Sequence, residues 1–397
     1  MKILVICQYY HPEPLRITDI CEELVKAGHD VTVVTGTPNY PMGEIYPGYE
    51  KGAHRDEVRG GVKIHRCPIH PRKTGIIHRV WNYFSYPRAS SKYIKKLAGD
   101  FDAVFINQLS PVMMANAGIK YAKKHGKRCV LYCLDLWPAS LRVGGIDGGI
   151  VYRWFYKLSE KVYRAVDKIL VSSKSFTEYF SQEFGITDTS YLPQYAEEAF
   201  TPEDCRKEPN ETVDLMFAGN VGTAQSVDTI IRAATLCKDL ENVRWHIVGD
   251  GKELEHCQKL AKETDAPVIF HGRRPVEEMP KYYAMADAML VTMQKEPIIS
   301  LTLPGKVQSY MAAGKPLIGA IDGETKRVIA EASCGLCADA EDAEGLAECV
   351  RQFIAADRAA FAQNSIDHYN AHFKKAMFIE RLEGALSEQP AKEKCEV

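Results

Sequence analysis

The chain contains no feature that would anchor it in a membrane or mark it for export. No stretch approaches the about 18 uninterrupted apolar residues that a helix needs to cross a bilayer. The amino terminus enters an apolar strand pattern at Ile3–Cys7 without the long apolar run and cleavage site of a signal peptide. The 12 cysteines form no spaced framework, which favours buried thiols in a reducing compartment over disulfides. We therefore expect a cytoplasmic protein.

Several chemical motifs are also missing. The serine-hydrolase elbow GxSxG is absent, and the segment 249–251 (GDG) lacks the full dinucleotide fingerprint, so we expect neither an α/β hydrolase nor an NAD enzyme. Asp100 and Asp102 match a metal-binding DxD pattern, but they flank the start of a strand, at the end away from ligands. Cys334 and Cys337 form one CxxC without a second pair or a histidine, which indicates a small buried strand. No metal and no cofactor is expected.

Acidic residues are missing from one long stretch, although the whole chain is nearly neutral with a net charge of -2. Between Val58 and Gly99 there is no Asp or Glu, and we call this segment the basic stretch. Its ten cations are Arg59, Lys63, Arg66, Arg72, Lys73, Arg79, Arg88, Lys92, Lys95 and Lys96. Its interleaved aromatic residues are Trp81, Tyr83, Phe84, Tyr86 and Tyr93. The global charge therefore conceals a local basic region.

A basic amphipathic element with aromatic residues is typical of proteins that lie on anionic lipid headgroups. Helical spacing of Ile76, Ile77, Val80 and Phe84 supports this interpretation. The same surface could receive a lipid-linked diphosphate. A solvated helix pair is the ordinary alternative, and nucleic acid is a further one, although no nucleic-acid motif accompanies the stretch. The residues expected to face the membrane are Arg72, Lys73, Arg79, Trp81 and Arg88.

Strand and helix patterns alternate along the whole chain, which predicts an α/β protein with parallel sheets and helical crossovers. The first series of strands is expected at Ile3–Cys7, Asp30–Thr35, Val62–Arg66, Ala103–Ile106, Cys129–Cys133 and Lys168–Ser172. The segment 191–205 interrupts the alternation, with two prolines. A second series is expected at Asp214–Ala218, Val243–Val248, Val268–His271, Ala288–Thr292 and Pro316–Ala320. We predict two Rossmann-like domains, 1–195 and 196–373, followed by a helix and polar tail, 374–397.

In parallel sheets, ligands bind where strands end, so the turns after the strands of the second domain are candidate sites. After the strand Asp214–Ala218 comes a turn with Gly219 and Gly222, which lets the backbone approach an anion. Pro304, Gly305 and Lys306 open an amphipathic helix, whose free amides and positive dipole end suit a diphosphate. A crossover without a ligand is the alternative interpretation.

A family resemblance becomes visible at this helix. The segment LPGKVQSYMAAGKPLIG (303–319) resembles the nucleotide-sugar region of the GT4 glycosyltransferases, which have the GT-B fold. CEELVKAGHDVTVVTGTPNYPMGEIYPGY, FAGNVGTAQSVDTIIRAA, WHIVGDG and FHGRRPVEEMPKYYAMADAMLV resemble further parts of the family, in order. The resemblance covers residues 1 to about 370. It is closest to the bacterial branch with the N-acetyl-L-fucosamine transferases of O-antigen and capsule assembly.

The resemblance implies two domains that face each other across a cleft, with the last helix returning to the first domain. It implies metal-independent transfer from a UDP-sugar, usually with retention at the anomeric carbon. The expected acceptor is a polyprenyl-diphosphate-linked sugar at the inner face of the membrane. The expected donor-binding residues are Gly219, Asn220, Gly222, Gln225, Gly249, Arg273, Glu296, Leu303, Pro304, Gly305, Lys306, Gln308 and Ser309.

The chain departs from the family where two glutamates are usual, because Leu301 and Ser309 occupy those positions. Glu296 lies five residues upstream of Leu301 and is a candidate substitute. Leu134 also stands where the family often has histidine, next to Asp135.

Three residues are expected to carry the chemistry. Lys306 and Arg273 would stabilise the charge that develops on the departing diphosphate, and Arg274 competes with Arg273 for this role. Asp135 would help remove the proton of the acceptor hydroxyl. The ordinary alternatives are surface cations and, for Asp135, a helix N-cap.

The acceptor is expected to contact loops at the strand ends of the first domain. The residues are Tyr10, Glu13, Arg16, Asn107, Gln108, Ser110 and Trp137. Glu13 and Arg16 could instead cap the first helix. Two other functions stay open: a UDP-sugar 2-epimerase with the GT-B fold, and a catalytically inactive subunit that only binds nucleotide sugars.

Overall fold

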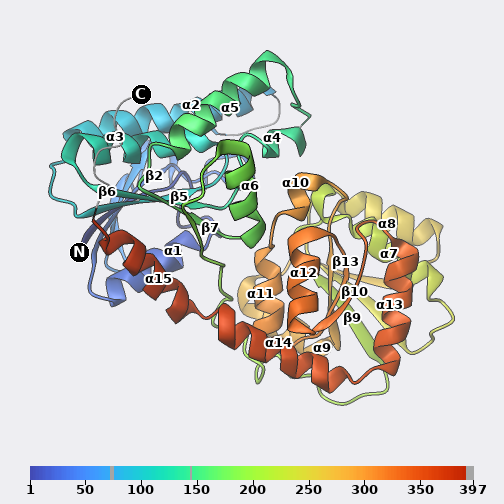
Figure 1. Cartoon of the computed structure of the whole chain (residues 1–397). Coiled ribbons are helices and arrows are strands. Elements are labelled where there is room, and N and C mark those ends of the chain that lie inside the picture. Colours follow the sequence, from blue (N-terminus) through green and yellow to red (C-terminus); the bar gives the residue numbers. More distant parts are fainter. Residues whose placement is uncertain (72–75, 144, 390–397) are drawn as a thin grey trace. The chain divides into compact units, whose positions relative to one another are not determined.

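The computed structural model describes residues 1–71, 76–143 and 145–389 (Figure 1). The chain divides into two compact units, and each is described by itself. Unit 1 contains Met1–Leu192 together with the segment from Ile379 onward, and unit 2 is Pro193–Phe378. The expected boundaries at 195 and 373 differ by a few residues. Tyr195 packs edge-on against Phe378 with ring centroids 5.1 Å apart, and both residues belong to unit 2.

Unit 1 is built on an eight-stranded sheet in which all neighbouring strands are parallel except β3 and β4. The order is β3 (Asp56–Arg59), β4 (Val62–Cys67), β2 (Asp30–Gly36), β1 (Lys2–Ile6), β5 (Ala103–Gln108), β6 (Arg128–Cys133), β7 (Lys168–Val171) and β8 (Thr189–Tyr191). The central strands β1, β5 and β6 are almost wholly buried, which explains their continuous apolar sequence. The six expected strands are present, and β3 and β8 extend the two edges.

Helices connect these strands. They are η1 (Glu50–Gly52), α1 (Ile17–Lys26), α2 (Ile76–Tyr93), η2 (Ile94–Lys96), η3 (Val112–Ala115), α3 (Asn116–His125), α4 (Ser140–Val143), α5 (Gly149–Tyr163) and α6 (Lys174–Phe184). The last helix, α15 (Lys375–Ser387), begins in unit 2 and ends in unit 1. There His29 Nε2 lies 2.6 Å from Glu383 Oε1, and Arg128 Nε donates to the Ala385 carbonyl at 3.2 Å.

Unit 2 has a six-stranded sheet that is parallel throughout. Its order is β11 (Val268–Gly272), β10 (Val243–Val248), β9 (Val213–Ala218), β12 (Ala288–Thr292), β13 (Leu317–Ala320) and β14 (Gly335–Ala338). Its helices are η4 (Thr223–Gln225), α7 (Val227–Leu236), α8 (Leu254–Glu263), η5 (Val276–Glu278), α9 (Met279–Met285), α10 (Pro297–Ser300), α11 (Gly305–Ala312), α12 (Gly323–Ala332), α13 (Ala343–Ala355) and α14 (Arg358–His372). Of the two CxxC residues, Cys334 directly precedes β14 and Cys337 lies within it. Cys334 is a buried free thiol.

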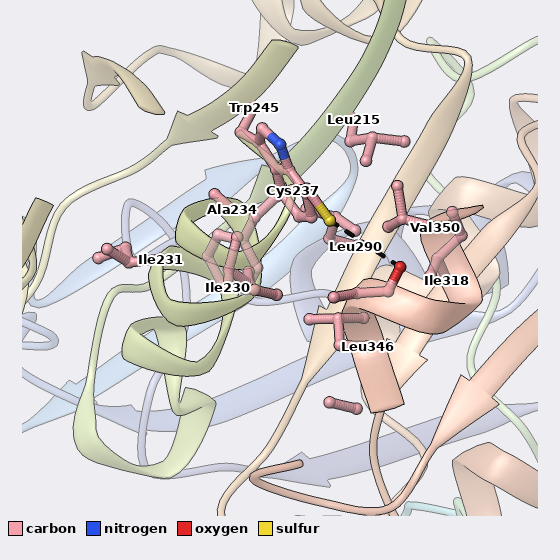
Figure 2. Packing of buried hydrophobic residues seen from close by; sticks show 14 of the residues in the cluster. Leu215, Ile230, Ile231, Ala234, Cys237, Trp245, Leu290, Ile318, Leu346 and Val350 are labelled. Carbon is pink, nitrogen blue, oxygen red and sulfur yellow. Dashed lines mark hydrogen bonds between the residues drawn. The ribbon is translucent and has the colours of Figure 1, made fainter. Parts of the chain in front are cut away.

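In unit 2, alternating residues of the strands belong to two apolar clusters, one on each face of the sheet. Leu215 of β9 and Trp245 of β10 pack with Ile230 of α7 and Val350 of α13 in one cluster (Figure 2). Met216 of β9 belongs to the second cluster, together with residues of α11 and α12. Burying one such side chain contributes about 1.5–3 kcal/mol, so both clusters hold the sheet and its helices together. The strand ends that carry the turns are thereby fixed.

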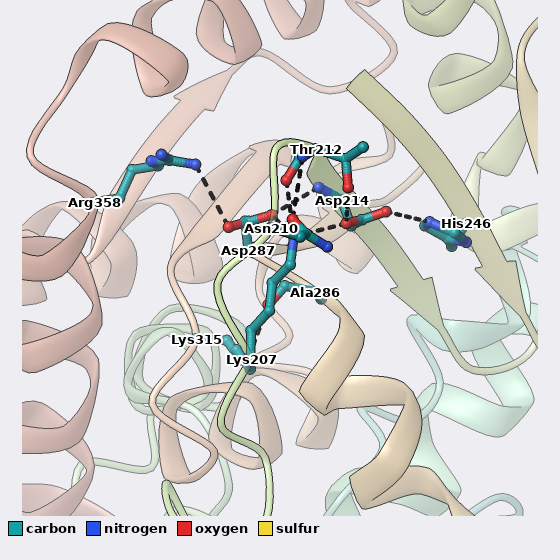
Figure 3. Close-up of polar contacts among 9 residues, drawn as sticks. All are labelled: Lys207, Asn210, Thr212, Asp214, His246, Ala286, Asp287, Lys315 and Arg358. Atoms are coloured by element: carbon teal, nitrogen blue, oxygen red, sulfur yellow. Dashed lines mark hydrogen bonds and ion pairs between the residues drawn. The ribbon is translucent and has the colours of Figure 1, made fainter. Parts of the chain in front are cut away.

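A buried polar network ties the start of β9 to the start of β12. Lys207 Nζ donates to the carboxylates of Asp214 and Asp287, and Asp214 Oδ1 lies 2.9 Å from His246 Nε2 (Figure 3). Burial by itself raises the pKa of Asp214, but hydrogen bonds from Lys207, His246 and Thr212 outweigh it and hold the pKa at about 2. The network lies at the amino-terminal ends of the strands, whereas the glycine turns follow their carboxyl-terminal ends. We therefore assign the network a structural role.

Candidate functional site

Two glycine turns at the ends of β9 and β10 lie backbone against backbone. Gly219 and Gly249 have φ angles of +143° and +146°, and Gly219 N donates to the Val248 carbonyl at 2.9 Å. A Cβ atom on Gly249 would lie 1.8 Å from the Gly219 carbonyl oxygen. Only glycine allows this approach and this conformation. The sequence placed both glycines in the donor set, and the structure brings them together.

Lys306, in the first turn of α11, points its ammonium group at the Gly219 turn. A Cβ atom on Gly219 would lie 2.9 Å from Lys306 Nζ, which itself lies 3.8 Å from the centre of the Phe217 ring. The nitrogen is shielded from solvent and has no hydrogen-bond partner among the described residues. Burial lowers the pKa of Lys306 to about 7. In this position the ammonium group contacts the face of one aromatic ring and has no carboxylate partner in the described part of the chain.

The start of α11 adds further positive character to this cluster. Pro304 is the N-cap residue and makes no side-chain capping bond. The amide of Val307 donates to the Pro304 carbonyl at 3.0 Å, so the amides of Gly305 and Lys306 are the ones that need other acceptors. The helix dipole places roughly half a positive charge at this end. Lys306, these amides and the backbone of Gly219 together form an arrangement suited to a diphosphate. Leu303, also in the predicted donor set, is buried directly before the helix.

The remaining donor candidates of the β9 turn interact with one another. Asn220 Nδ2 donates to Gln225 Oε1 at 3.0 Å across the turn. A Cβ atom on Gly222 would lie 2.5 Å from Asn220 Nδ2, so the glycine leaves room for this bond. The pair closes the turn ahead of α7 and presents amide groups rather than charges.

Gln308 and Ser309 of α11 are both buried and engaged within the protein. In the orientation that satisfies its amide, Gln308 donates to the carbonyls of Pro304 at 2.9 Å and Gly305 at 3.1 Å. Ser309 Oγ donates to Glu197 Oε2 at 2.8 Å. Glu197 thus places a carboxylate beside Ser309, where the family usually has its own glutamate. Sequence reasoning missed Glu197, because it lies in an irregular segment before the first strand of unit 2.

Glu296 and the two arginines after β11 lie on other loops of unit 2. Glu296 is the half-buried N-cap residue of α10 and makes no side-chain capping bond. Arg273 is exposed and has no ion pair with any residue in the described part of the chain. Arg274 lies over the Tyr282 ring at 5.6 Å. Of the two competing arginines, Arg273 is therefore the one whose charge is uncommitted.

Two surface hollows of unit 2 lie near some of these residues but not at Lys306. One borders the β9 turn and is lined by Gly222, Thr223 and Glu253 among others. The second is lined by Glu197 together with Tyr369 and Lys375 among others. We base the site on the glycine turns and Lys306, because a buried cation without a partner is the stronger chemical indication of an anion.

In unit 1, Glu13 organises two loops at the ends of β1 and β2. Its buried carboxylate accepts from the backbone amides of Tyr10 at 2.8 Å, Asn39 at 2.8 Å and Tyr40 at 2.7 Å. Burial raises the pKa of Glu13 to about 7, against the effect of these bonds. The helix-cap interpretation is wrong for Glu13, since its carboxylate binds amides outside α1. Arg16 stands at the N-cap position of α1, but its side chain makes no capping hydrogen bond.

The ends of β5 and β6 bring four more predicted acceptor residues together. Gln108 Nε2 donates to the Asp135 carbonyl at 3.0 Å, and Trp137 Nε1 donates to Ser110 Oγ at 2.9 Å. Trp137 is fully buried and belongs to the core beneath the loops. Asp135 is half-buried and accepts from Ser140 Oγ at 3.2 Å. Nearby, the buried Oδ1 of Asn107 has no partner among the described residues.

The basic stretch divides into paired and exposed cations. Lys63 lies 2.8 Å from Asp30, and the buried Arg66 lies 2.7 Å from Glu57, so both have acidic partners from outside the stretch. Trp81 and Arg88 of α2 are exposed. Arg72 and Lys73 lie outside the described residues, as does the side chain of Arg79. Where the structure is described, no helix is long and apolar enough to span a membrane.

The comparison with known proteins adds two family matches and several relatives. Residues 212–356 match the glycosyl transferases group 1 family, and residues 15–193 match a glycosyl transferase 4-like domain. "Putative colanic acid biosynthesis glycosyl transferase WcaI" of Escherichia coli strain K12 is 24% identical over 89% of this chain and 92% of its own.

Two solved structures are similar over nearly the whole chain. Sucrose-phosphate synthase of Thermosynechococcus elongatus has a TM-score of 0.75 at 14% identity, and covers 97% of this chain and 98% of its own. Anabaena HepE, solved in complex with UDP and glucose, has a TM-score of 0.71 at 15% identity, with coverages of 98% and 100%. At these identities the structures show a shared fold.

Proposed function

Since the chain belongs to the GT4 family of GT-B glycosyltransferases, we propose that it takes a sugar from a UDP-sugar to a polyprenyl-diphosphate-linked acceptor. The product would be an intermediate of a bacterial surface polysaccharide such as O-antigen or capsule. The similarity to a colanic acid biosynthesis glycosyl transferase of E. coli supports the polysaccharide context, and the UDP complex of HepE supports the donor class. An N-acetylated amino or deoxy sugar is the proposed donor moiety.

The single observation that carries the proposal is the solvent-shielded Nζ of Lys306, which lacks a hydrogen-bond partner beside Gly219 and the first turn of α11. An unpaired buried cation costs several kcal/mol unless an anion compensates it. The diphosphate of a nucleotide sugar supplies acceptor oxygens both to the ammonium group and to the free helix amides. Binding of the donor would thus give hydrogen-bond acceptors to the Lys306 ammonium group and to the free amides of α11.

In the proposed reaction, the bond between the anomeric carbon and the diphosphate oxygen breaks, and UDP leaves with the electron pair. The acceptor hydroxyl oxygen forms the new bond to the anomeric carbon, with retention of configuration, and its proton passes to Asp135. Lys306, Arg273 and the α11 amides stabilise the charge on UDP as it develops. These groups supply the positive charge in place of a metal ion.

The acceptor is assigned to unit 1. The amides and carbonyls around Asn107, Gln108 and Asp135 offer hydrogen bonds to sugar hydroxyls at the ends of β5 and β6. The exposed cations of α2 and η2, among them Arg88 and Lys92, suit a lipid diphosphate and an anionic membrane surface. We propose that the protein works at the inner face of the membrane while bound to its surface.

The test is a transfer assay with a panel of UDP-sugars and a synthetic polyprenyl-diphosphate acceptor. Product in the presence of the lipid supports the proposal. An epimerised UDP-sugar without acceptor would instead identify a 2-epimerase, and UDP binding without either product an inactive subunit. An NMR spectrum of the product decides between retention and inversion.

A lysine pair gives the assay its control. Lys306→Met removes the unpartnered ammonium group, whereas Lys315→Met removes a second buried lysine of unit 2 whose Nζ donates to the Ala286 carbonyl at 2.8 Å. We expect the first change to weaken UDP binding by about 10- to 100-fold, since a charge-assisted hydrogen bond contributes about 1.5–3 kcal/mol. The second should leave UDP binding intact. Equal UDP affinity in both variants would contradict the assignment.

A further inference from the structure

Exposed large hydrophobic side chains are concentrated on one part of unit 1. Of the 14 such residues in the described chain, eight lie on α2, on α5 or just before α5. They are Val80, Trp81, Phe84, Val143, Ile146, Ile150, Val151 and Trp154. We call the six of them on the two helices the α2–α5 face. Monomeric proteins rarely expose such a contiguous apolar group without using it for binding.

The two helices of this face are held next to each other. The rings of Phe84 on α2 and Trp154 on α5 lie 6.2 Å apart, and both helices lie on the same side of the sheet (Figure 1). Trp154 also packs edge-on against Phe155 at 4.8 Å, and Phe155 packs against the buried Trp137 at 5.3 Å. Trp154 is therefore anchored at its base while 51% of it remains exposed.

The charged residues are placed in the same way on both helices. On α5, the apolar residues Ile150, Val151 and Trp154 come first, and Lys157 and Lys161 follow on the exposed surface. On α2, exposed Val80, Trp81 and Phe84 are likewise followed by Arg88 and Lys92. An apolar group is thus bordered by cations on each helix.

Two acidic residues, one on α5 and one in the turn before it, have basic partners close by. Asp147, in the turn before the helix, lies 3.1 Å from Arg142. Glu160 lies 3.0 Å from Arg164 on the solvent side of the same helix. Arg153, Lys157 and Lys161 are exposed on α5 next to its apolar residues.

We propose that the α2–α5 face inserts into the outer layer of an anionic lipid membrane, with Ile150, Val151 and Trp154 of α5 entering the acyl region. The lysines and arginines that follow on each helix would then lie at headgroup level. This inference deepens the membrane association of the proposed function and rests on it. It adds a penetrating apolar element from α5, which the charge of the basic stretch does not supply.

The pattern of charge favours lipid over a second copy of the chain. In a twofold dimer through this face, the cations of one copy would lie against those of the other, which is unfavourable. Anionic headgroups neutralise the same cations, and Trp side chains prefer the interface between headgroups and acyl chains. Burial of one large apolar side chain contributes about 1.5–3 kcal/mol.

Vesicle sedimentation with mixed phosphatidylglycerol and phosphatidylcholine tests the inference. In the variant Ile150→Ser, Val151→Ser, Trp154→Ser, the partition onto vesicles should fall at least about a hundredfold, because each tenfold step corresponds to about 1.4 kcal/mol. Leu236→Ser removes an exposed hydrophobic residue of unit 2 with 47% exposure, and should leave the partition unchanged. Unchanged binding of the triple variant would overturn the inference.

The salt dependence of vesicle binding distinguishes insertion of apolar side chains from adsorption through surface charges alone. At 0.5 M NaCl, where charges more than a few ångström apart are screened, wild-type protein should stay bound and the triple variant should not. The variant Arg88→Gln, Lys157→Gln, Lys161→Gln should bind more weakly at 0.1 M salt and like wild type at 0.5 M. Complete release of the wild type at 0.5 M salt would overturn insertion and leave adsorption alone.

Tryptophan quenching locates the inserted side chain. In a Trp81→Phe background, vesicles with brominated acyl chains should quench the fluorescence of Trp154, and Trp154→Phe should abolish that quenching. Sedimentation velocity tests the alternative that a second copy of the chain covers the α2–α5 face. The inference would be overturned if the wild type formed a dimer that dissociates in the triple variant and if vesicles did not quench the wild-type fluorescence.

UDP binding and transfer to a detergent-soluble lipid acceptor distinguish this inference from the proposed function. Both should be retained by the triple variant. If both are retained by wild type and variant while vesicle insertion fails, only the membrane inference falls. If UDP binding itself fails in the wild type, the proposed function falls.

Discussion

Lys306 Nζ lies 3.8 Å from the centre of the Phe217 ring and has no hydrogen-bond partner among the described residues. A face-on aromatic ring attracts a cation by about 2 kcal/mol when the pair is desolvated. That is less than the cost of removing an ammonium group from water, and so burial lowers the pKa of Lys306 to about 7. The relationship makes the protonation of one lysine dependent on whether an anion is bound.

The first prediction is that UDP binding takes up a proton. At pH 8 the free protein holds Lys306 mostly neutral, whereas the diphosphate favours its charged form and raises its pKa. UDP has itself released its protons at this pH, because the second phosphate pKa lies near 6. Calorimetry in buffers with different ionisation enthalpies should show an uptake approaching one proton. In Lys306→Met the binding enthalpy should no longer depend on the buffer.

The same lysine predicts how stability depends on pH without ligand. Between pH 7 and the ordinary lysine pKa, the unfolded chain holds a proton that the folded chain has released. The free energy of unfolding therefore rises with pH across this window. Lys306→Met should remove that rise and stabilise the ligand-free protein at pH 7 by about 1–3 kcal/mol. Loss of stability in this variant would mean that Lys306 has a partner in solution.

The contact between the two glycine turns leads to a third prediction. Gly249→Ala should lower the melting temperature and weaken UDP binding at least tenfold, since its Cβ atom would lie 1.8 Å from the Gly219 carbonyl oxygen. Gly384→Ala is the matched control, because nothing lies within 4 Å of a Cβ atom at this exposed position of α15. The control should gain up to about 1 kcal/mol in helix stability and bind UDP normally.

The sequence allowed the strands to be predicted because their signal is local. β10 and β12 have the bounds expected from the sequence, while β3 and β8 were missed as short edge strands without a buried residue. An edge strand forms because it pairs with a neighbouring strand. A short sequence of mixed polarity does not show that such a partner exists. The fold class and the succession of strands along the chain follow from the alternation, whereas the order in which the strands pair within each sheet needs the structure.

The candidate site was only partly predictable for the same reason. Gly219 and Lys306 were each identified from their own turn, but their approach joins segments far apart in the chain. Glu197 gave no signal, because one carboxylate in an irregular segment has no pattern. The exposure of Trp154 was equally hidden, since a helix that is apolar on several sides does not reveal which side is covered.

A fourth prediction separates the two arginines after β11. Arg273→Ala should lower kcat/KM for transfer about a hundredfold or more, because a group that stabilises the leaving diphosphate acts mainly in the transition state. Arg274→Ala should keep transfer near wild type and reduce stability by about 0.5–1 kcal/mol, as its guanidinium lies over Tyr282. The reverse pattern in steady-state kinetics and thermal melts would assign the diphosphate to Arg274.

The last prediction concerns acid stability of unit 2. Asp214 titrates at about 2 in the folded chain, below its ordinary value near 3.9 in the unfolded chain. Its stabilising contribution is therefore complete above about pH 4 and is lost as the pH falls toward 2. Asp214→Asn should lower the free energy of unfolding at pH 7 by about 2–3 kcal/mol and flatten its dependence on pH in that window.

Denaturant unfolding at a series of pH values checks this result. Asp239→Asn is a suitable control, because Asp239 forms its ion pair with Arg351 on the exposed surface of the same unit. Exposed pairs contribute about 0–1 kcal/mol, so this variant should stay close to wild type at pH 7. If both variants lose equal stability, burial of the Lys207–Asp214–His246 network adds nothing beyond an ordinary surface ion pair.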